Sequence, residues 1–108
     1  MKKDNVVEIL YTDECPFWKE TLRLIEDTAK DLKVVVAIRK VKISSKKDAE
    51  KLRFPGSPTV RVNGVDIDPA AKEVAGGIGC RIYMFKGSTY EFPPKEMIKF
   101  GFERLLRK

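Results

Sequence analysis

Two cysteines, Cys15 and Cys80, are the residues of this chain that are best suited to chemistry. The sequence holds no histidine, which excludes catalysis by a cysteine that an imidazole base activates. Structural zinc sites use four cysteine or histidine ligands, so we predict no zinc site and no cofactor. Two thiolates could still bind a soft ion such as Hg(II) or Cu(I). Thiol–disulfide exchange and soft-metal carriage therefore remain open.

Cys15 lies where the pattern changes from a strand to a helix. Val6–Tyr11 is an apolar, β-branched run of strand length, and from Trp18 apolar residues recur at helical spacing, at 18, 22, 25, 29 and 32. Pro16 suits the first helical position, which leaves Cys15 as the helix cap. At a cap, free backbone N–H groups and the helix dipole favour the thiolate over the thiol. The competing interpretation is an inert cysteine in the core, because free cysteines are among the most buried residues.

The next elements bring the chain back beside the first strand. Val34–Val41 is a second strand, apolar enough to be buried on both faces, and it forms a βαβ unit with the helix before it. A serine then caps a short helix over Lys46–Leu52, whose Ala49 and Leu52 face inward. A cluster of prolines and a glycine over residues 54–58 ends this helix.

A hairpin follows, and after it a connection that ends at the second cysteine. Thr59–Val62 is a third strand, and Asn63-Gly64 is a strong hairpin signal that returns the chain antiparallel through residues 65–67. The connection over Pro69–Gly79 is rich in glycine and leads to Cys80.

The rest of the chain adds a second hairpin and a last helix. Two short strands are expected over residues 81–85 and 89–92, and apolar residues recur at helical spacing from Pro94 to Arg107. The predicted class is therefore α/β, with a βαβαββ core, a mixed sheet, an extra hairpin and a C-terminal helix. A length of 108 residues suits a single domain over residues 1–108.

The order of these motifs resembles the thioredoxin and glutaredoxin superfamily. The residues that carry the resemblance are Cys15-Pro16-Phe17-Trp18 at the strand-to-helix junction and Gly56-Ser57-Pro58-Thr59 before the Asn63-Gly64 hairpin. With Cys80-Arg81-x-Tyr83 before two prolines, the chain is also similar to small thioredoxin-like proteins of prokaryotes. The resemblance implies that the Ser57-Pro58 peptide is cis and that this proline lies against the sulfur of Cys15.

The resemblance also implies roles for individual residues. Cys15 would be the nucleophile, the backbone of Ser57 would pair with an extended thiol substrate, and the substrate would contact Pro16, Phe17, Ser57, Pro58 and Thr59. Trp18 stands where a Cys-x-x-Cys site has its second cysteine, so the site is monothiol. A lone thiol needs a second thiol to resolve its mixed disulfide, and Cys80 is the internal candidate.

Whether Cys80 can reach Cys15 depends on the connection between the hairpins. The turn at Asn63-Gly64 returns the chain to the end of the sheet where Cys15 lies, so an approach is feasible. The connection over Pro69–Gly79 is long enough to lead elsewhere as well. Both outcomes remain open at the level of the sequence.

Three aromatic side chains and two basic ones stand near these motifs. Trp18 shares its helical stripe with apolar residues, which favours core packing over a lid above a substrate. Phe17 lies off that stripe and is the better candidate for an exposed contact with partners. Tyr11 ends the first strand and could border the site. Arg81 and Lys86 are expected to be solvated charges.

Charge and hydropathy limit the partners. The net charge is +6, but basic and acidic residues are interleaved and form no basic block, so no nucleic-acid partner is predicted. The longest apolar run is far shorter than the roughly 20 residues that cross a bilayer, and no signal-peptide pattern opens the chain. We expect a cytoplasmic monomer without membrane contact, whose partners are protein or low-molecular-weight thiols and disulfides.

The sequence thus predicts a thiol–disulfide oxidoreductase-like protein, with Cys15 as nucleophile and Cys80 or an external thiol as resolver. One alternative is a thioredoxin-fold binding or adaptor module without redox turnover, which the missing Cys-x-x-Cys permits. Another is a thiolate carrier of a soft metal or an organomercurial, because some proteins of the resembling group are associated with mercury resistance.

Overall fold

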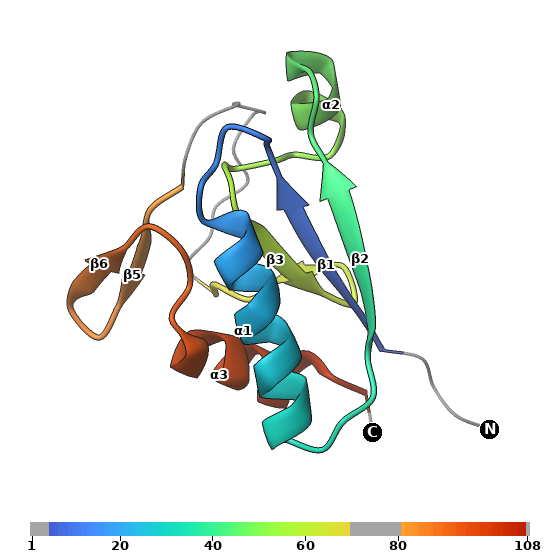
Figure 1. Ribbon diagram of the computed structural model, residues 1–108, viewed down its shortest axis with the longest axis vertical. Helices are drawn as coiled ribbons and strands as arrows, with labels where there is room; N and C mark the ends of the chain where they lie inside the picture. The colour runs from blue at the N-terminus through green and yellow to red at the C-terminus, as the bar shows by residue number, and fades with distance from the viewer. Residues whose placement is uncertain (1–4, 70–80, 108) are drawn as a thin grey trace.

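The computed structural model describes residues 5–69 and 81–107, and the elements within them form a mixed α/β fold (Figure 1). The predicted α/β class is confirmed at this level. In chain order the elements are β1 (Val6–Tyr11), α1 (Trp18–Asp31), β2 (Ala37–Lys42), α2 (Lys46–Lys51), β3 (Thr59–Val62), β4 (Val65–Asp66), β5 (Tyr83–Phe85), β6 (Ser88–Tyr90) and α3 (Lys95–Leu105).

Four of the strands form one mixed sheet in the order β2-β1-β3-β4. β1 runs parallel to β2 and antiparallel to β3, and β3 pairs antiparallel with β4. The turn between β3 and β4 is the predicted one: Asn63 and Gly64 both have positive φ, at 51° and 87°, as a two-residue hairpin turn requires. The Asn63 Oδ1 also accepts from the N–H of Val6 at 2.9 Å, which fixes this turn against the start of β1.

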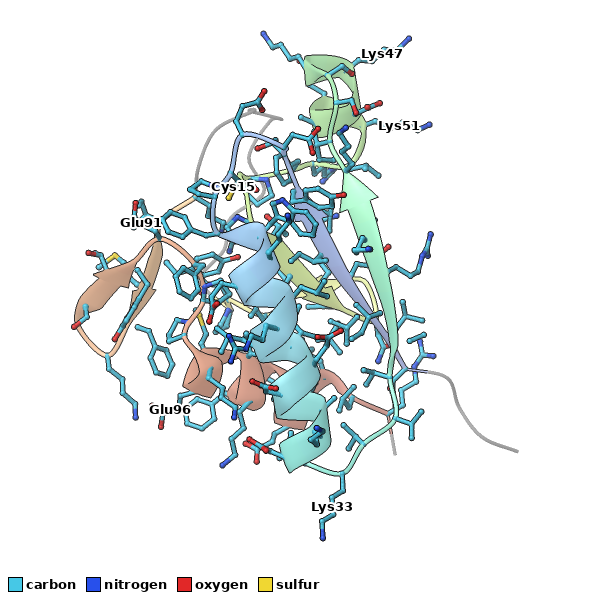
Figure 2. All side chains as sticks on the ribbon, viewed as in Figure 1. Cys15, Lys33, Lys47, Lys51, Glu91 and Glu96 are labelled. Carbon is cyan, nitrogen blue, oxygen red and sulfur yellow. The ribbon has the colours of Figure 1, made fainter. Side chains whose placement is uncertain are left out.

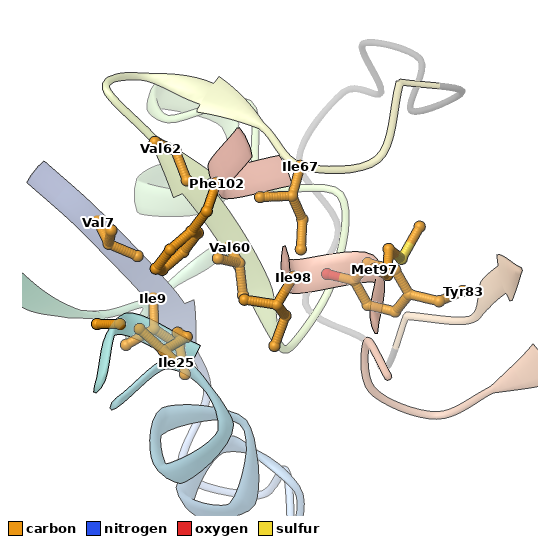
Figure 3. Close-up of a cluster of buried hydrophobic side chains, with 11 residues drawn as sticks. Val7, Ile9, Ile25, Val60, Val62, Ile67, Tyr83, Met97, Ile98 and Phe102 are labelled. Atoms are coloured by element: carbon orange, nitrogen blue, oxygen red, sulfur yellow. The ribbon is translucent and has the colours of Figure 1, made fainter. Parts of the chain in front are cut away.

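The larger core lies on the face of the sheet that α1 and α3 cover (Figures 1 and 3). Alternate strand residues point into it, as the period of two in a strand dictates, and they meet one side of each helix. Its buried members are Val7, Ile9, Ile25, Ala29, Val60, Val62, Ile67, Tyr83, Met97, Ile98 and Phe102. The helical spacing that predicted α1 and α3 therefore marks the faces that these helices bury.

A smaller core lies on the opposite face, where α2 packs. Its buried members are Leu10, Ile43, Ala49 and Phe54. The predicted serine cap is confirmed, because the Ser45 hydroxyl accepts from the N–H of Asp48 at 3.1 Å. Leu52 was predicted to face inward, but 36% of its surface is exposed and it lies just past the end of α2.

The second strand differs from its prediction in both extent and environment. It was expected over Val34–Val41 with both faces buried, whereas β2 begins at Ala37 and is an outer strand of the sheet with mostly exposed residues. The end of α1 explains the shift: Lys33 has a φ of 55°, and the N–H of Val34 donates back to the carbonyl of Ala29 at 3.0 Å. This closing turn occupies the first part of the apolar run.

The second predicted hairpin forms a separate two-stranded sheet, which extends to one side of the main sheet in Figure 1. Lys86 and Gly87 form its turn, with φ of 52° and 82°. The strands are shorter than expected, because β5 begins at Tyr83 rather than at Arg81. Arg81 instead packs against the loop before β3, and this contact shapes the candidate site.

Candidate functional site

Cys15 lies in the loop that joins β1 to α1, at the end of the sheet nearest α2 (Figure 2). Its surface is 3% exposed. Its N–H donates to the carbonyl of Thr12 at 3.1 Å, which closes a tight turn directly after β1. The thiol is therefore held in a short, hydrogen-bonded loop and is buried at the edge of the core.

The prediction that Cys15 caps the helix is wrong. α1 begins at Trp18 with Phe17 as its cap, and the carbonyl of Phe17 accepts from both the N–H of Thr21 at 3.0 Å and its hydroxyl at 2.9 Å. Pro16 belongs to the preceding turn rather than to the first helical position. The turn that Cys15 closes with Thr12 is the reason, since it sets the direction of the chain before the helix starts. Any reactivity of Cys15 must then come from its other surroundings.

Thr12 connects the cysteine loop to the loop that precedes β3. The N–H of Thr12 donates to the Ser57 hydroxyl at 3.1 Å, and its carbonyl accepts from Cys15. Thr12 and Ser57 are both buried. The peptide bond from Ser57 to Pro58 is cis, as the resemblance implied. The structure thus brings together the two motifs on which the site prediction depends, although they are far apart in the sequence.

Arg81 was expected to be a solvated charge, but it is buried, with 7% of its surface exposed. Its guanidinium forms an ion pair with Asp66 at 2.7 Å and approaches Asp68 at 3.6 Å. Burial lowers the pKa of Arg81, but the hydrogen bond and the charge of Asp66 more than compensate, so this pKa lies above its ordinary value. Lys86 is exposed, as predicted, in an ion pair with Glu96.

The backbone and side chain of Arg81 together hold the loop before β3. The N–H of Arg81 donates to the carbonyl of Ser57 at 3.0 Å, and its Nη1 donates to the Thr59 hydroxyl at 3.2 Å. Gly56, with a φ of 134°, packs so closely that an added Cβ would lie 2.9 Å from the Cβ of Arg81. Glycine has no Cβ, so it can adopt this φ and still leave room for Arg81 to pack this closely.

Tyr83 completes this set of contacts. Its side chain is fully buried, and its hydroxyl donates to the carbonyl of Pro58 at 2.6 Å. The guanidinium of Arg81 stacks over its ring, 4.2 Å from the centroid. Burial raises the pKa of Tyr83 far above its ordinary value, so the phenol is neutral and donates its hydrogen bond.

The carbonyls of residues 56, 57 and 58 all have partners within the chain. The Thr59 hydroxyl donates to the carbonyl of Gly56 at 2.6 Å, and Arg81 and Tyr83 donate to the other two.

The residues predicted to contact a substrate fall into two groups. Pro16 is exposed and Phe17 is half-buried, so both flank the cysteine from the surface. Ser57, Pro58 and Thr59 are buried. The hydroxyls of Ser57 and Thr59 are used within the loop, so these side chains act as its supports. The carbonyl of Ser57, expected to pair with a substrate, is already bound to Arg81.

Two aromatic pairs border the cysteine loop. Trp18 stacks on Tyr11 with ring centroids 4.1 Å apart and also packs against the larger core, which agrees with its predicted packing role. Phe17 was expected to be exposed, but it stacks on Phe92 at 5.5 Å. Nothing in the sequence indicated this role of Phe92, because Phe92 follows β6 and Phe17 is distant from it in the chain.

The sequence did not predict the part that Arg81 and Tyr83 have in the candidate site. The two residues appeared only in the Cys80-Arg81-x-Tyr83 motif of the resemblance, and Arg81 was expected to be a solvated charge. A buried ion pair has no hydropathy signature, and the spacing of Asp66 and Asp68, two residues apart at a predicted strand, was a further hint. Cys80, the predicted resolver, lies outside the described residues, as does residue range 70–79 of the predicted connection. Within the described ranges, no cluster of three or more metal-ligating side chains occurs, and no helix there is long and apolar enough to cross a membrane.

The chain belongs to the family described as a domain of unknown function, DUF2703, whose model matches residues 7–100. That range extends from β1 into α3 and contains Cys15, the loop before β3, and Arg81. No curated protein and no solved structure matches the chain. The family membership therefore identifies no activity, and the geometry of the site carries the functional argument.

Proposed function

We propose that this chain is a thioredoxin-like thiol–disulfide exchange protein in which Cys15 is the nucleophile. The observation that carries the proposal is the pair of hydrogen bonds made by Thr12, to Cys15 on one side and to Ser57 on the other. They connect the lone thiol after β1 to the loop before β3, which is the juxtaposition that a thioredoxin-like site needs. The order β2-β1-β3-β4, with helices on both faces, is compatible with such a fold.

The chemistry proceeds in two exchange steps. The Cys15 thiolate attacks one sulfur of a disulfide, a new sulfur–sulfur bond forms, and the other sulfur leaves as a thiolate that takes up a proton. A second thiol then attacks the mixed disulfide. If this thiol is external and attacks the substrate's sulfur, Cys15 leaves as a thiolate and the external thiol becomes disulfide-bonded to the substrate. If it is Cys80 and attacks the sulfur of Cys15, the substrate's sulfur leaves as a thiolate and the two cysteines form a disulfide.

Two features of the site support a role for Cys80 as the internal resolver. Arg81 follows Cys80 directly in the chain, and the N–H of Arg81 is bound to Ser57, which in turn is bound to Thr12. Because Arg81 is also held by Asp66 and Tyr83, its position beside the cysteine loop is well determined. Cys80 is the residue that precedes this anchored position in the sequence, which makes it the internal thiol to test.

A second function is favoured by the low exposure of Cys15. At 3% exposed, the thiol is nearly closed to solvent, and each of the neighbouring carbonyls of residues 56–58 already accepts a hydrogen bond from within the chain. Strand addition needs unpaired backbone groups. A binding or adaptor module without redox turnover would retain this arrangement unchanged.

Single-turnover exchange with a chromogenic aromatic disulfide separates these functions. Cys15→Ser should abolish thiol release, because it removes the nucleophile. Cys80→Ser should leave the first step unchanged and trap the mixed disulfide at Cys15, which mass spectrometry detects. Folding of each variant is checked by circular dichroism.

Release of thiol by Cys15→Ser at the wild-type rate would overturn the assignment of the nucleophile. Absence of reaction in the wild-type protein, with both thiols reduced, would favour the adaptor instead. Equal trapping in wild type and in Cys80→Ser would point to an external resolver.

A further inference from the structure

A groove with three arginines lies along β4, the outer strand on one side of the sheet. Its volume is about 490 Å³, within the range of small-molecule sites. The arginine groove, as we call it, is lined by Arg53, Arg61 and Arg104 together with the apolar side chains of Leu52, Pro55 and Val65. These residues come from the end of α2, from β3 and β4, and from α3, so the tertiary fold gathers positive charge from separate elements.

The guanidinium of Arg61 is held in a fixed orientation. Its Nη2 donates to the carbonyls of Leu52 and Arg53, at 2.9 and 3.1 Å, just after α2. Among the described residues its Nε and Nη1 have no hydrogen-bond partner, and no carboxylate forms an ion pair with it. Glu8, directly across from Arg61 on β1, is instead paired with Arg39 at 3.6 Å. The remaining donors of Arg61 are therefore available in a preorganised position.

Arg104, on α3, adds a second guanidinium to the lining of the groove. Its only hydrogen bond to the described residues runs from Nη2 to the carbonyl of Ile67, at 3.3 Å. The carboxylates that also line the groove, Asp66 and Asp68, are both engaged with the buried Arg81. Arg81 offsets one of these two negative charges, so the three arginines that line the groove leave positive charge in excess there.

We propose that the arginine groove binds the phosphate group of a small molecule. A carboxylate has two oxygens and one charge, and one guanidinium satisfies it, as Arg81 satisfies Asp66 in this chain. A phosphate monoester carries a charge near −2 and three acceptor oxygens, so it can bridge guanidinium groups that come from different elements. The apolar side chains of Leu52, Pro55 and Val65 would contact the organic part of the ligand. Cys15 does not line the groove, so this site is independent of the proposed exchange function.

Titration of the isotope-labelled full chain with inorganic phosphate, at an ionic strength kept constant with sodium chloride, tests the proposal by NMR. We expect saturable shifts of the Nε–H signals of Arg61 and Arg104 and of the backbone amides around the groove. Arg104→Gln should weaken phosphate binding by roughly tenfold, because a charge-assisted hydrogen bond is lost. Arg23→Gln is the matched control, since it removes the same charge from an exposed position on α1 outside the groove.

Three outcomes would overturn the proposal. One is a set of shifts that sodium chloride alone reproduces. Another is equal weakening by Arg104→Gln and Arg23→Gln, which would indicate general screening. The third is tighter binding of succinate than of phosphate, which would identify a carboxylate site. If Arg104→Gln perturbs the fold, Arg61→Lys gives a second measurement: it keeps the charge but loses the planar fork, and an intermediate loss is expected.

Discussion

At the scale of single residues, the guanidinium of Arg81 links the parts of the candidate site. It is bound to Asp66 and Thr59 through its nitrogens and to the ring of Tyr83 through its face. Its backbone N–H holds Ser57, whose hydroxyl holds Thr12 and through it the loop of Cys15. A substitution at Arg81 would remove the contacts of its side chain with Asp66, Thr59 and Tyr83, and it would reach the loop of Cys15 only by displacing the backbone that donates to Ser57.

Arg81→Met should destabilise the protein by about 3–5 kcal/mol, because it removes the cation that is paired with the largely buried carboxylate of Asp66. Arg39→Met is the matched control: its ion pair with Glu8 is 3.6 Å long and mostly exposed, and such pairs contribute about 0–1 kcal/mol. Urea unfolding measures both. Equal losses for the two variants would contradict the view that burial decides the strength of the Arg81 pair.

At the scale of elements, α2 shows how hydrogen bonds from side chains stabilise both ends of a short helix. Six residues are too few for a stable isolated helix, so caps and packing must supply the stability. The Ser45 hydroxyl satisfies the N–H of Asp48 at the start, and Arg61 satisfies the carbonyls of Leu52 and Arg53 after the end. Ala49 and Phe54 then pack against the sheet.

Ser45→Ala should lower the free energy of unfolding by about 1 kcal/mol, the usual cost of removing a side-chain cap. Ser44→Ala provides the control, because Ser44 is the neighbouring exposed serine and makes no cap. Chemical denaturation followed by circular dichroism gives both values. The role assigned to Ser45 would not survive a result in which Ser44→Ala costs as much.

At the scale of the whole molecule, α3 joins the C-terminal part of the chain to the sheet. Gly101 lies against Ile67, just past β4, and an added Cβ would come within 2.6 Å of the Ile67 side chain. Phe102 and Ile98 on the same helix fill the core between α1 and the sheet (Figure 3). The absence of a side chain at position 101 therefore sets how closely the helix approaches.

Gly101→Ala has two opposite effects on the free energy of unfolding, and the larger of them decides whether the protein gains or loses stability. Helix propensity alone predicts a gain of about 0.8–1 kcal/mol, whereas overpacking against Ile67 costs about 1–3 kcal/mol. We expect a net loss of stability in thermal unfolding. The double variant Gly101→Ala with Ile67→Val should recover part of this loss, because the valine shortens the side chain at the contact. A net gain from Gly101→Ala alone would show that α3 can move away from Ile67.

The sequence by itself determined the elements whose signals are local. The strand β3 and the turn at Asn63-Gly64 were predicted at their observed positions, and so was the serine cap of α2, because propensity, turn chemistry and capping act between neighbours in the chain. The same holds for the buried faces of α1 and α3, whose spacing is a property of the helix itself.

Only the tertiary structure decided the environment of the site. The place of β2 at an outer position, the burial of Arg81 with Asp66, and the hydrogen bond from Thr12 to Ser57 depend on which distant segments pack together. Ser57 and Thr12 are 45 residues apart, and no pattern within a helix or strand specifies such a pair. The sequence could name Cys15 and Pro58 as candidates, because the order of the motifs that contain them resembles that of the thioredoxin and glutaredoxin superfamily. The fold determined what surrounds them, because desolvation and ion pairing depend on three-dimensional contacts.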